Sequence, residues 1–145
     1  MCIVGGLLFK GGELLLMRRF IMGDYLWKVK TVPAYSNFLI DRTGTRTVAT
    51  TDTPTFCIYL SEELYGDFKK TVLIHEITHA ALFSLGILER IHIYCRPEFV
   101  IDAEEEICNI VADYGQLIFD SAYQVLGESA MRIVPQILEE RIMSI

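Results

Sequence analysis

The order of segments along the chain predicts an α+β fold, with strands in the first 60 residues and helices in the remainder. Short stretches rich in β-branched and aromatic residues recur up to Leu60, and Gly or Pro turn signals separate them. After that point, long segments carry apolar residues at helical spacing. The length of 145 residues suits one domain, 1–145, with a sizeable core.

The first 22 residues are expected to form a β-hairpin that is an addition to the main domain. Apolar runs at 3–9 and 13–20 flank Lys10-Gly11-Gly12, which is a turn signal. A short helix is the alternative for this segment, because residues 14–16 are all leucine.

Four further segments have the character of strands. Residues 25–32 alternate apolar and polar side chains and end at Pro33, which is typical of a half-buried strand. Shorter strands are expected at 36–40, 45–51 and 55–60, with a turn at 41–44 between the first two.

The second half of the chain predicts three helices. The first covers 66–85 and ends at Gly86, a natural stop signal. A connector with strand or turn content is expected at 87–100. The second helix covers about 102–126, and an amphipathic C-terminal helix follows at about 129–143.

Charge and hydropathy exclude some partners and suggest others. With 13 basic and 19 acidic residues the net charge is −6, which argues against a nucleic-acid partner. No uninterrupted apolar stretch of about 18 residues is present, so we expect no membrane-spanning helix and no membrane partner. The mean hydropathy of +0.35 is high for a small chain and suggests a homo-oligomer that covers apolar surface.

The cysteines and the N-terminus favour a cytoplasmic protein. The opening segment has no basic region of the kind that begins a signal peptide. The four cysteines do not form a C-x-x-C pair, so we expect reduced thiols that mostly serve as small core residues. They are Cys2, Cys57, Cys95 and Cys108.

The most informative motif is H-E-x-x-H, formed by His75, Glu76 and His79 within an apolar helical segment. Residues four apart lie on one face of a helix, so both imidazoles can reach one Zn²⁺. Glu76 is better placed to accept a proton from water at the metal than to bind the metal. A helix that is apolar nearly all round is buried, and a dry environment strengthens each electrostatic interaction at the site.

A third protein ligand is expected from the acidic run at 104–106, because catalytic zinc usually has three protein ligands and one open position. Helical spacing favours Glu105, with Glu104 as the next candidate. From Glu105 the same face continues through Cys108 and Asn109, and Asn109 could accept a hydrogen bond from a ligand histidine. Glu106 is expected to be solvated. An acidic first turn that only complements the helix dipole is the alternative.

Another possible ligand source is the pair His92 and Cys95, in the predicted connector. A thiolate binds zinc well, but it more often marks a structural site than a catalytic one. His92, Tyr94 and Tyr114 are candidates for a donor to an oxyanion, although each is more often structural.

The motif H-E-I-T-H-A, followed about 25 residues later by E-E-E-I-C-N-I-V-A-D, resembles the minigluzincins. These are small zinc metallopeptidase-like proteins, many of which are carried by phages and mobile elements. Glu105, Cys108 and Ala112 fit the pattern of the family's glutamate helix, and the resemblance covers roughly residues 45–120. It implies a zincin-like fold, in which a small antiparallel sheet packs on the histidine helix and the glutamate helix. It also implies that the strand at 55–60 lies along the cleft and can pair with an extended peptide.

These observations predict a zinc-dependent peptidase that acts on a peptide or protein substrate. Zn²⁺ is held by His75, His79 and Glu105, and Glu76 is the general base. The alternative is a non-catalytic, zinc-stabilised binding or regulatory protein of phage or mobile-element type.

Overall fold

The computed structural model describes residues 3–4, 7–10, 13–16 and 18–131. The chain divides into two compact units, residues 1–112 and 113–145. In the described part of the chain, the first unit contains all the strands, two complete α-helices and the first half of a third, which confirms the predicted α+β class.

The main sheet has four strands in the order β4-β5-β7-β6. Their bounds are Arg19–Met22 for β4, Tyr25–Val32 for β5, Ala49–Asp52 for β6 and Cys57–Ser61 for β7. β4 pairs with β5, and β6 with β7, in antiparallel fashion, but β5 and β7 run parallel. The expectation of an antiparallel sheet was therefore wrong, because β7 inserts between β5 and β6 instead of forming a hairpin with β5.

The central position of β7 corrects a second expectation. Its main chain has a partner on each side, so it cannot pair with an extended peptide as the resemblance implied. The edge strand on this side of the sheet is β6.

The N-terminal hairpin is confirmed in part. β2 (Leu7–Lys10) and β3 (Glu13–Leu16) pair in antiparallel fashion, and β1 (Ile3–Val4) adds a third strand beside β2. Residues 19–22 do not continue this hairpin. They form β4 of the main sheet, because Phe20 and Met22 pack against the core around Trp27.

The predicted strand at 36–40 is instead a 3₁₀ turn, η1 (Asn37–Leu39). The Ser36 hydroxyl accepts a hydrogen bond from the Phe38 amide, and the Phe38 ring stacks on Tyr59 of β7. Such side-chain caps favour turns over strands. η1 thereby covers the face of the sheet that carries Cys57 and Tyr59. The predicted turn at 41–44 is present, and the next strand begins only at Ala49.

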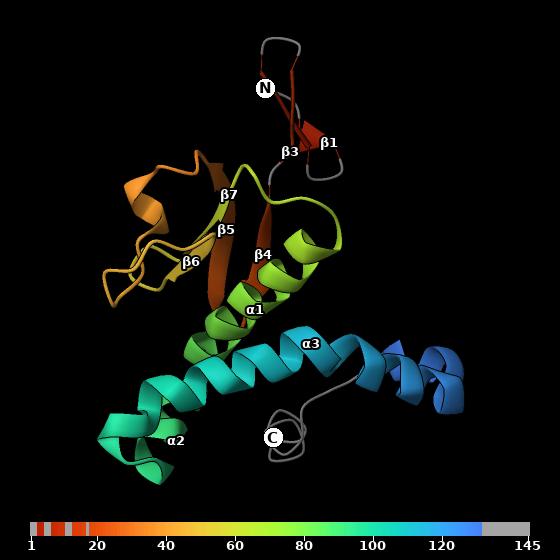
Figure 1. Cartoon of the computed structure of the whole chain (residues 1–145). Coiled ribbons are helices and arrows are strands. Elements are labelled where there is room, and N and C mark those ends of the chain that lie inside the picture. Colours follow the sequence, from red (N-terminus) through yellow and green to blue (C-terminus); the bar gives the residue numbers. More distant parts are fainter. Residues whose placement is uncertain (1–2, 5–6, 11–12, 17, 132–145) are drawn as a thin grey trace. The chain divides into compact units, whose positions relative to one another are not determined.

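The histidine helix is α1 (Gly66–Ser84), and it packs on the opposite face of the sheet from η1 (Figure 1). No side chain from 71 to 84 is exposed, as expected for a helix that is apolar nearly all round. Gly86 adopts a φ of 70° and ends the helix as predicted, because glycine enters the left-handed region without steric cost.

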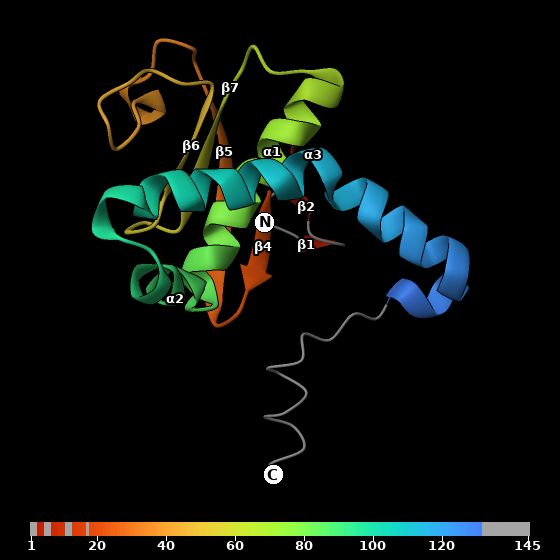
Figure 2. The ribbon, with the colours of Figure 1, turned by 60° about the horizontal axis from the view of Figure 1, so that its bottom comes forward.

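The expected connector at 87–100 was wrong, because most of it is helical. α2 (Ile87–Tyr94) begins directly after Gly86, and the 3₁₀ turn η2 (Pro97–Phe99) leads into α3 (Val100–Leu126). α2 forms because Ile87 and Ile91 pack into a small core with Leu82 of α1 and Val100 of α3. Figure 2 shows α2 as a separate short helix beside the start of α3.

α3 ends before Gly127 as predicted. The described chain then continues as a 3₁₀ turn, η3 (Gly127–Met131). The remainder of the predicted C-terminal helix at 129–143 lies outside the described residues. Among the described segments, no single helix is long and apolar enough to cross a bilayer; α1 and α2 pass that test only as a pair bent by 82°.

Trp27 is the centre of the core between the sheet and α1. Its side chain is fully buried and packs near the aromatic rings of Phe20, Phe56 and Phe83. Its indole N–H donates a 2.8 Å hydrogen bond to the hydroxyl of Ser84 at the end of α1. This contact ties β5 to the helix that carries the histidines.

Replacement of Trp27 by Ala should lower the free energy of unfolding by about 3–5 kcal/mol, because it leaves a large cavity and removes the Ser84 contact. Tyr35→Ala is the matched control, since Tyr35 is 79% exposed and its loss should change stability by no more than about 0.5 kcal/mol. Urea unfolding of both variants measures the difference. Equal free energies of unfolding for Trp27→Ala and Tyr35→Ala would show that Trp27 is not central to the core.

Candidate metal centre

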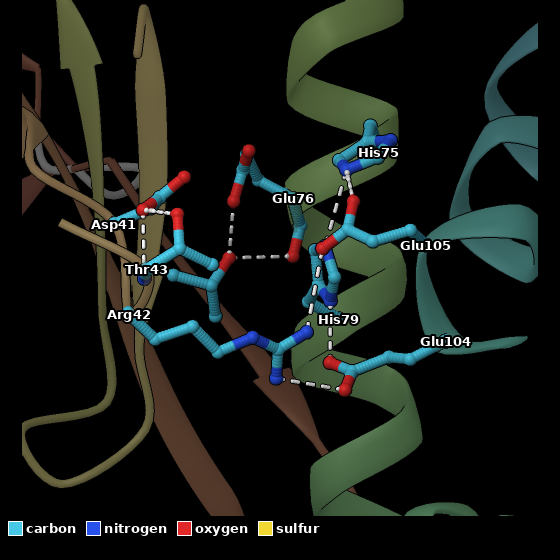
Figure 3. A network of polar contacts seen from close by, with 9 residues as sticks. Asp41, Arg42, Thr43, His75, Glu76, His79, Glu104 and Glu105 are labelled. Atoms are coloured by element: carbon cyan, nitrogen blue, oxygen red, sulfur yellow. Dashed lines mark hydrogen bonds and ion pairs between the residues drawn. The ribbon is translucent and has the colours of Figure 1, made fainter. Parts of the chain in front are cut away.

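The two motif histidines face one another on α1. Their Nε2 atoms are 3.1 Å apart, and their side chains are only 20% and 11% exposed for His75 and His79. This arrangement follows from the helix itself, in which residues four apart share a face. Figure 3 shows both rings on the side of α1 that faces Glu104 and Glu105 of α3.

The Glu105 carboxylate lies over the two imidazoles. Its Oε2 atom is 3.3 Å from His75 Nε2, and its Oε1 atom is 3.5 Å from His79 Nε2. Tetrahedral zinc with bonds of about 2.0–2.1 Å holds its ligand atoms about 3.3–3.4 Å apart. The three separations between nitrogen and oxygen donors, 3.1, 3.3 and 3.5 Å, bracket that value. The side chains present therefore fit a zinc ion held by the two Nε2 atoms and the Glu105 carboxylate.

Glu104 supports His79 from the other side of the ring. Its Oε1 atom is 2.7 Å from His79 Nδ1, and its side chain is only 7% exposed. Burial alone would raise the pKa of Glu104, but hydrogen bonds from His79 and Arg42 and the Arg42 charge lower it. An ionised carboxylate can only accept a hydrogen bond. The proton of His79 is therefore on Nδ1, and this N–H group donates a hydrogen bond to Glu104. In the neutral ring this leaves the Nε2 lone pair on the side of His75 and Glu105.

The hydrogen bond between Glu104 and His79 corrects the role expected for Asn109. Asn109 is exposed, and the hydrogen-bond partner of His79 is Glu104. Burial would lower the pKa of His79, but the Glu104 hydrogen bond and the nearby carboxylates Glu76 and Glu105 raise it. The metal-free site therefore holds a proton at His79 more tightly than free imidazole does.

Glu76 points from α1 toward the sheet and is 7% exposed (Figure 3). The hydroxyl of Thr51 on β6 lies 2.6 Å from its Oε2 atom and 3.0 Å from its main-chain oxygen. Burial is the largest influence on Glu76 and raises the pKa of its carboxyl, although the Thr51 hydrogen bond and the two histidines oppose this shift. A raised pKa brings a carboxylate closer to the range in which a general base works at neutral pH.

Cys108 is a further donor close to the histidines. Its Sγ atom and one nitrogen of each histidine all lie within 4.8 Å of one another, and the residue is fully buried. Burial raises the pKa of its thiol to about 12, with nearby Glu104 and Glu105 adding to the shift. Zinc binds the thiolate and itself displaces the thiol proton on binding, so Cys108 and Glu105 are both possible third donors beside the two histidines.

The other candidates from the sequence lie elsewhere. His92 and Tyr94 are exposed on α2, and Cys95 packs into the core between α2 and α3. Glu106 is exposed, as expected. Tyr114 is 55% exposed and belongs to the second unit.

Two polar partners of the site were missed by the sequence analysis. Thr51 comes from the edge strand β6, and Arg42 from the turn after η1 contacts both Glu104 and Glu105. Neither residue belongs to a motif, and each lies more than 20 residues from its partner in the chain. No local pattern could have identified them.

The comparisons with known proteins add no assignment. No protein-family model matches the chain, and no curated protein sequence matches it. The residues and their geometry are therefore the basis for the functional argument.

Replacement of Glu76 by Gln should stabilise the metal-free protein at pH 7, because it removes a buried carboxylate whose ionised form is disfavoured by burial. Burial raises the pKa of Glu76 above its ordinary value of 4.5. The folded wild type therefore binds this proton more tightly than the unfolded chain, and its stability rises as the pH falls through the raised pKa. The Gln variant lacks that dependence, so the gap should be largest near pH 7 and should close by about pH 4.5.

Urea unfolding in the presence of a chelator, at both pH values, measures this gap. Glu106→Gln is the control, because Glu106 is exposed on the surface of α3. A wild-type protein at least as stable as Glu76→Gln at neutral pH would contradict the assignment of a disfavoured buried charge.

Proposed function

We propose that this protein is a zinc-dependent peptidase, with His75, His79 and Glu105 as metal ligands and Glu76 as the general base. The observation that carries the proposal is the spacing of the donors: two Nε2 atoms and the Glu105 carboxylate lie 3.1–3.5 Å from one another. The buried carboxylate of Glu76 follows directly after the first ligand in the chain.

Zinc, when bound, polarises the substrate carbonyl and lowers the pKa of a water molecule toward 7. The chain contributes the rest of the chemistry. Glu76, with its raised pKa, accepts the proton from the attacking water and returns it to the leaving amine. Thr51 holds the Glu76 carboxylate in place through a 2.6 Å hydrogen bond.

The edge strand β6 is the proposed binding site for an extended peptide. The Ser61 amide donates to the Val48 carbonyl, so hydrogen-bonded pairs in the β6–β7 ladder occur at Val48, Thr50 and Asp52. The main-chain groups of Ala49 and Thr51 therefore point away from β7, toward the edge of the sheet, where the Ala49 carbonyl accepts a hydrogen bond from the Thr47 hydroxyl. Because the Thr51 side chain contacts Glu76, a peptide paired with this edge would pass beside the general base.

This arrangement is similar to what the resemblance to the minigluzincins implies: a zincin-like core with a histidine helix and a glutamate helix. The similarity supports peptide-bond hydrolysis as the reaction class. The substrate strand in this proposal is β6 instead of β7.

Zinc content and hydrolysis should separate in two variants. Glu76→Gln should keep zinc at about one ion per chain but lose about 10²–10⁴-fold in the rate of peptide hydrolysis, because it removes the general base. His79→Ala should lose both zinc and activity, since it removes a ligand. Metal analysis and cleavage of a mixed peptide library measure the two properties. Glu106→Ala is the control on α3, and undiminished cleavage by Glu76→Gln would refute the mechanism.

A second candidate function has one observation in its favour. Cys108 could join His75, His79 and Glu105 and complete a set of four protein ligands, which is typical of structural zinc. The protein would then be a zinc-stabilised binding or regulatory protein without turnover.

Cobalt substitution distinguishes the two candidates. The peptidase proposal predicts that Glu105→Ala weakens Co²⁺ binding, while Cys108→Ala leaves both the affinity and the visible spectrum unchanged. A closed structural site predicts an intense near-ultraviolet charge-transfer band from the thiolate that disappears in Cys108→Ala. Presence of that band in the wild type would favour the second candidate.

A further inference from the structure

Arg42 reaches from the sheet side of the first unit to both carboxylates of the candidate metal centre. Its Nη1 atom is 2.9 Å from Glu104 Oε2, and its Nη2 atom is 3.3 Å from Glu105 Oε1. Its side chain is 47% exposed, so the guanidinium lies at the rim of the site. Figure 3 shows it extending across to α3.

The turn that carries Arg42 is held by its neighbours. Asp41 Oδ1 accepts hydrogen bonds from the Thr43 amide at 2.8 Å, the Thr43 hydroxyl at 2.6 Å and the Thr45 amide at 2.9 Å. The Asp41 amide donates to the Thr45 carbonyl at 2.9 Å, which closes the turn. These contacts fix the main chain on both sides of Arg42, so the side chain begins from a defined position.

The charges of the centre balance only when Arg42 is included. Glu104 and Glu105 contact the two imidazoles, and Glu76 lies close enough to interact electrostatically with both. With a divalent cation and neutral rings the sum is −1, and Arg42 brings it to zero. Buried charge without a partner is costly, and both Glu76 and Glu104 are buried.

The shape of the guanidinium matters as well as its charge. The planar, forked guanidinium of Arg42 contacts the carboxylates of two successive residues of α3. Side chains of successive residues point about 100° apart around a helix axis. Arg42 binds Oε2 of Glu104 and so holds Oε1 of the same carboxylate against His79. It also holds the Glu105 carboxylate over the Nε2 atoms of the two histidines. A lysine ammonium would preserve the charge without this fork.

We propose that Arg42 is a positioning residue that holds Glu104 against His79 and Glu105 over the histidine pair, and that it thereby sets the affinity of the centre for its metal. This inference rests on the proposed zinc site. It assigns a role to a residue outside the H-E-x-x-H motif and outside the acidic run.

The test is zinc affinity, measured by competition with a chromophoric chelator for the wild type, Arg42→Ala, Arg42→Lys and the control Arg96→Ala. Loss of a group that orients metal ligands typically weakens binding about 10–100-fold, and we expect this for Arg42→Ala. Arg42→Lys should be intermediate, because it keeps the charge but not the fork. Arg96 is exposed on the segment before η2, and its replacement should have no effect.

Two additional readouts separate positioning from general structural damage. At saturating Co²⁺, the visible spectrum of Arg42→Ala should differ from that of the wild type while its far-ultraviolet circular dichroism stays the same. Millimolar guanidinium should restore part of the zinc affinity of Arg42→Ala. If Arg42→Ala does not fold, the comparison of Arg42→Lys with the wild type decides the question.

The outcomes distinguish a failure of the role of Arg42 from a failure of the metal centre itself. Wild-type zinc binding that is lost in His79→Ala but unchanged in both Arg42 variants would overturn the role of Arg42 alone. A wild type that binds no zinc would overturn the metal centre and, with it, this inference.

Discussion

The hydrogen bond between His79 and Glu104 is the contact on which the candidate centre depends. It joins α1 to the second turn of α3, and both side chains are almost completely buried. It holds the proton on Nδ1 of His79 and so orients the opposite nitrogen toward His75. Because Glu105 is the next residue on the helix, the same contact brings its carboxylate over the two rings.

The sheet contributes to this centre through two polar side chains. Thr51 from β6 contacts Glu76, and Arg42 from the turn after η1 contacts Glu104. Each of the two buried carboxylates therefore has a hydrogen-bond partner outside its own helix. This is what a buried polar group requires, since an unsatisfied one is costly in a medium of low dielectric constant. Trp27 completes the connection by tying β5 to the end of α1.

The errors in the predicted elements have identifiable causes. Residues 36–40 have a composition typical of a strand. The hydrogen bond from the Phe38 amide to the Ser36 hydroxyl and the stacking of Phe38 on Tyr59 favour a turn instead. Residues 87–94 have few helix signals. They form a helix because Ile87 and Ile91 then pack against Leu82 and Val100 in a small apolar core. Tertiary packing outweighed local preference in both places. The strand at 25–32 was predicted well because its apolar and polar residues alternate. The strand at 55–60 and the histidine helix were predicted well because each is a largely apolar run bounded by turn signals.

The sequence by itself determined that His75 and His79 share a helix face and that Glu76 lies beside them, because helical periodicity is a local property. It also limited the nearby carboxylates to the run at 104–106. Only the tertiary structure decided that Glu104 supports His79, that Glu105 faces both rings, and that Arg42 and Thr51 join them. These roles depend on where α3, β6 and the turn at 41–45 meet α1. Contacts between residues 25 to 63 positions apart set that meeting point, and no local pattern encodes them.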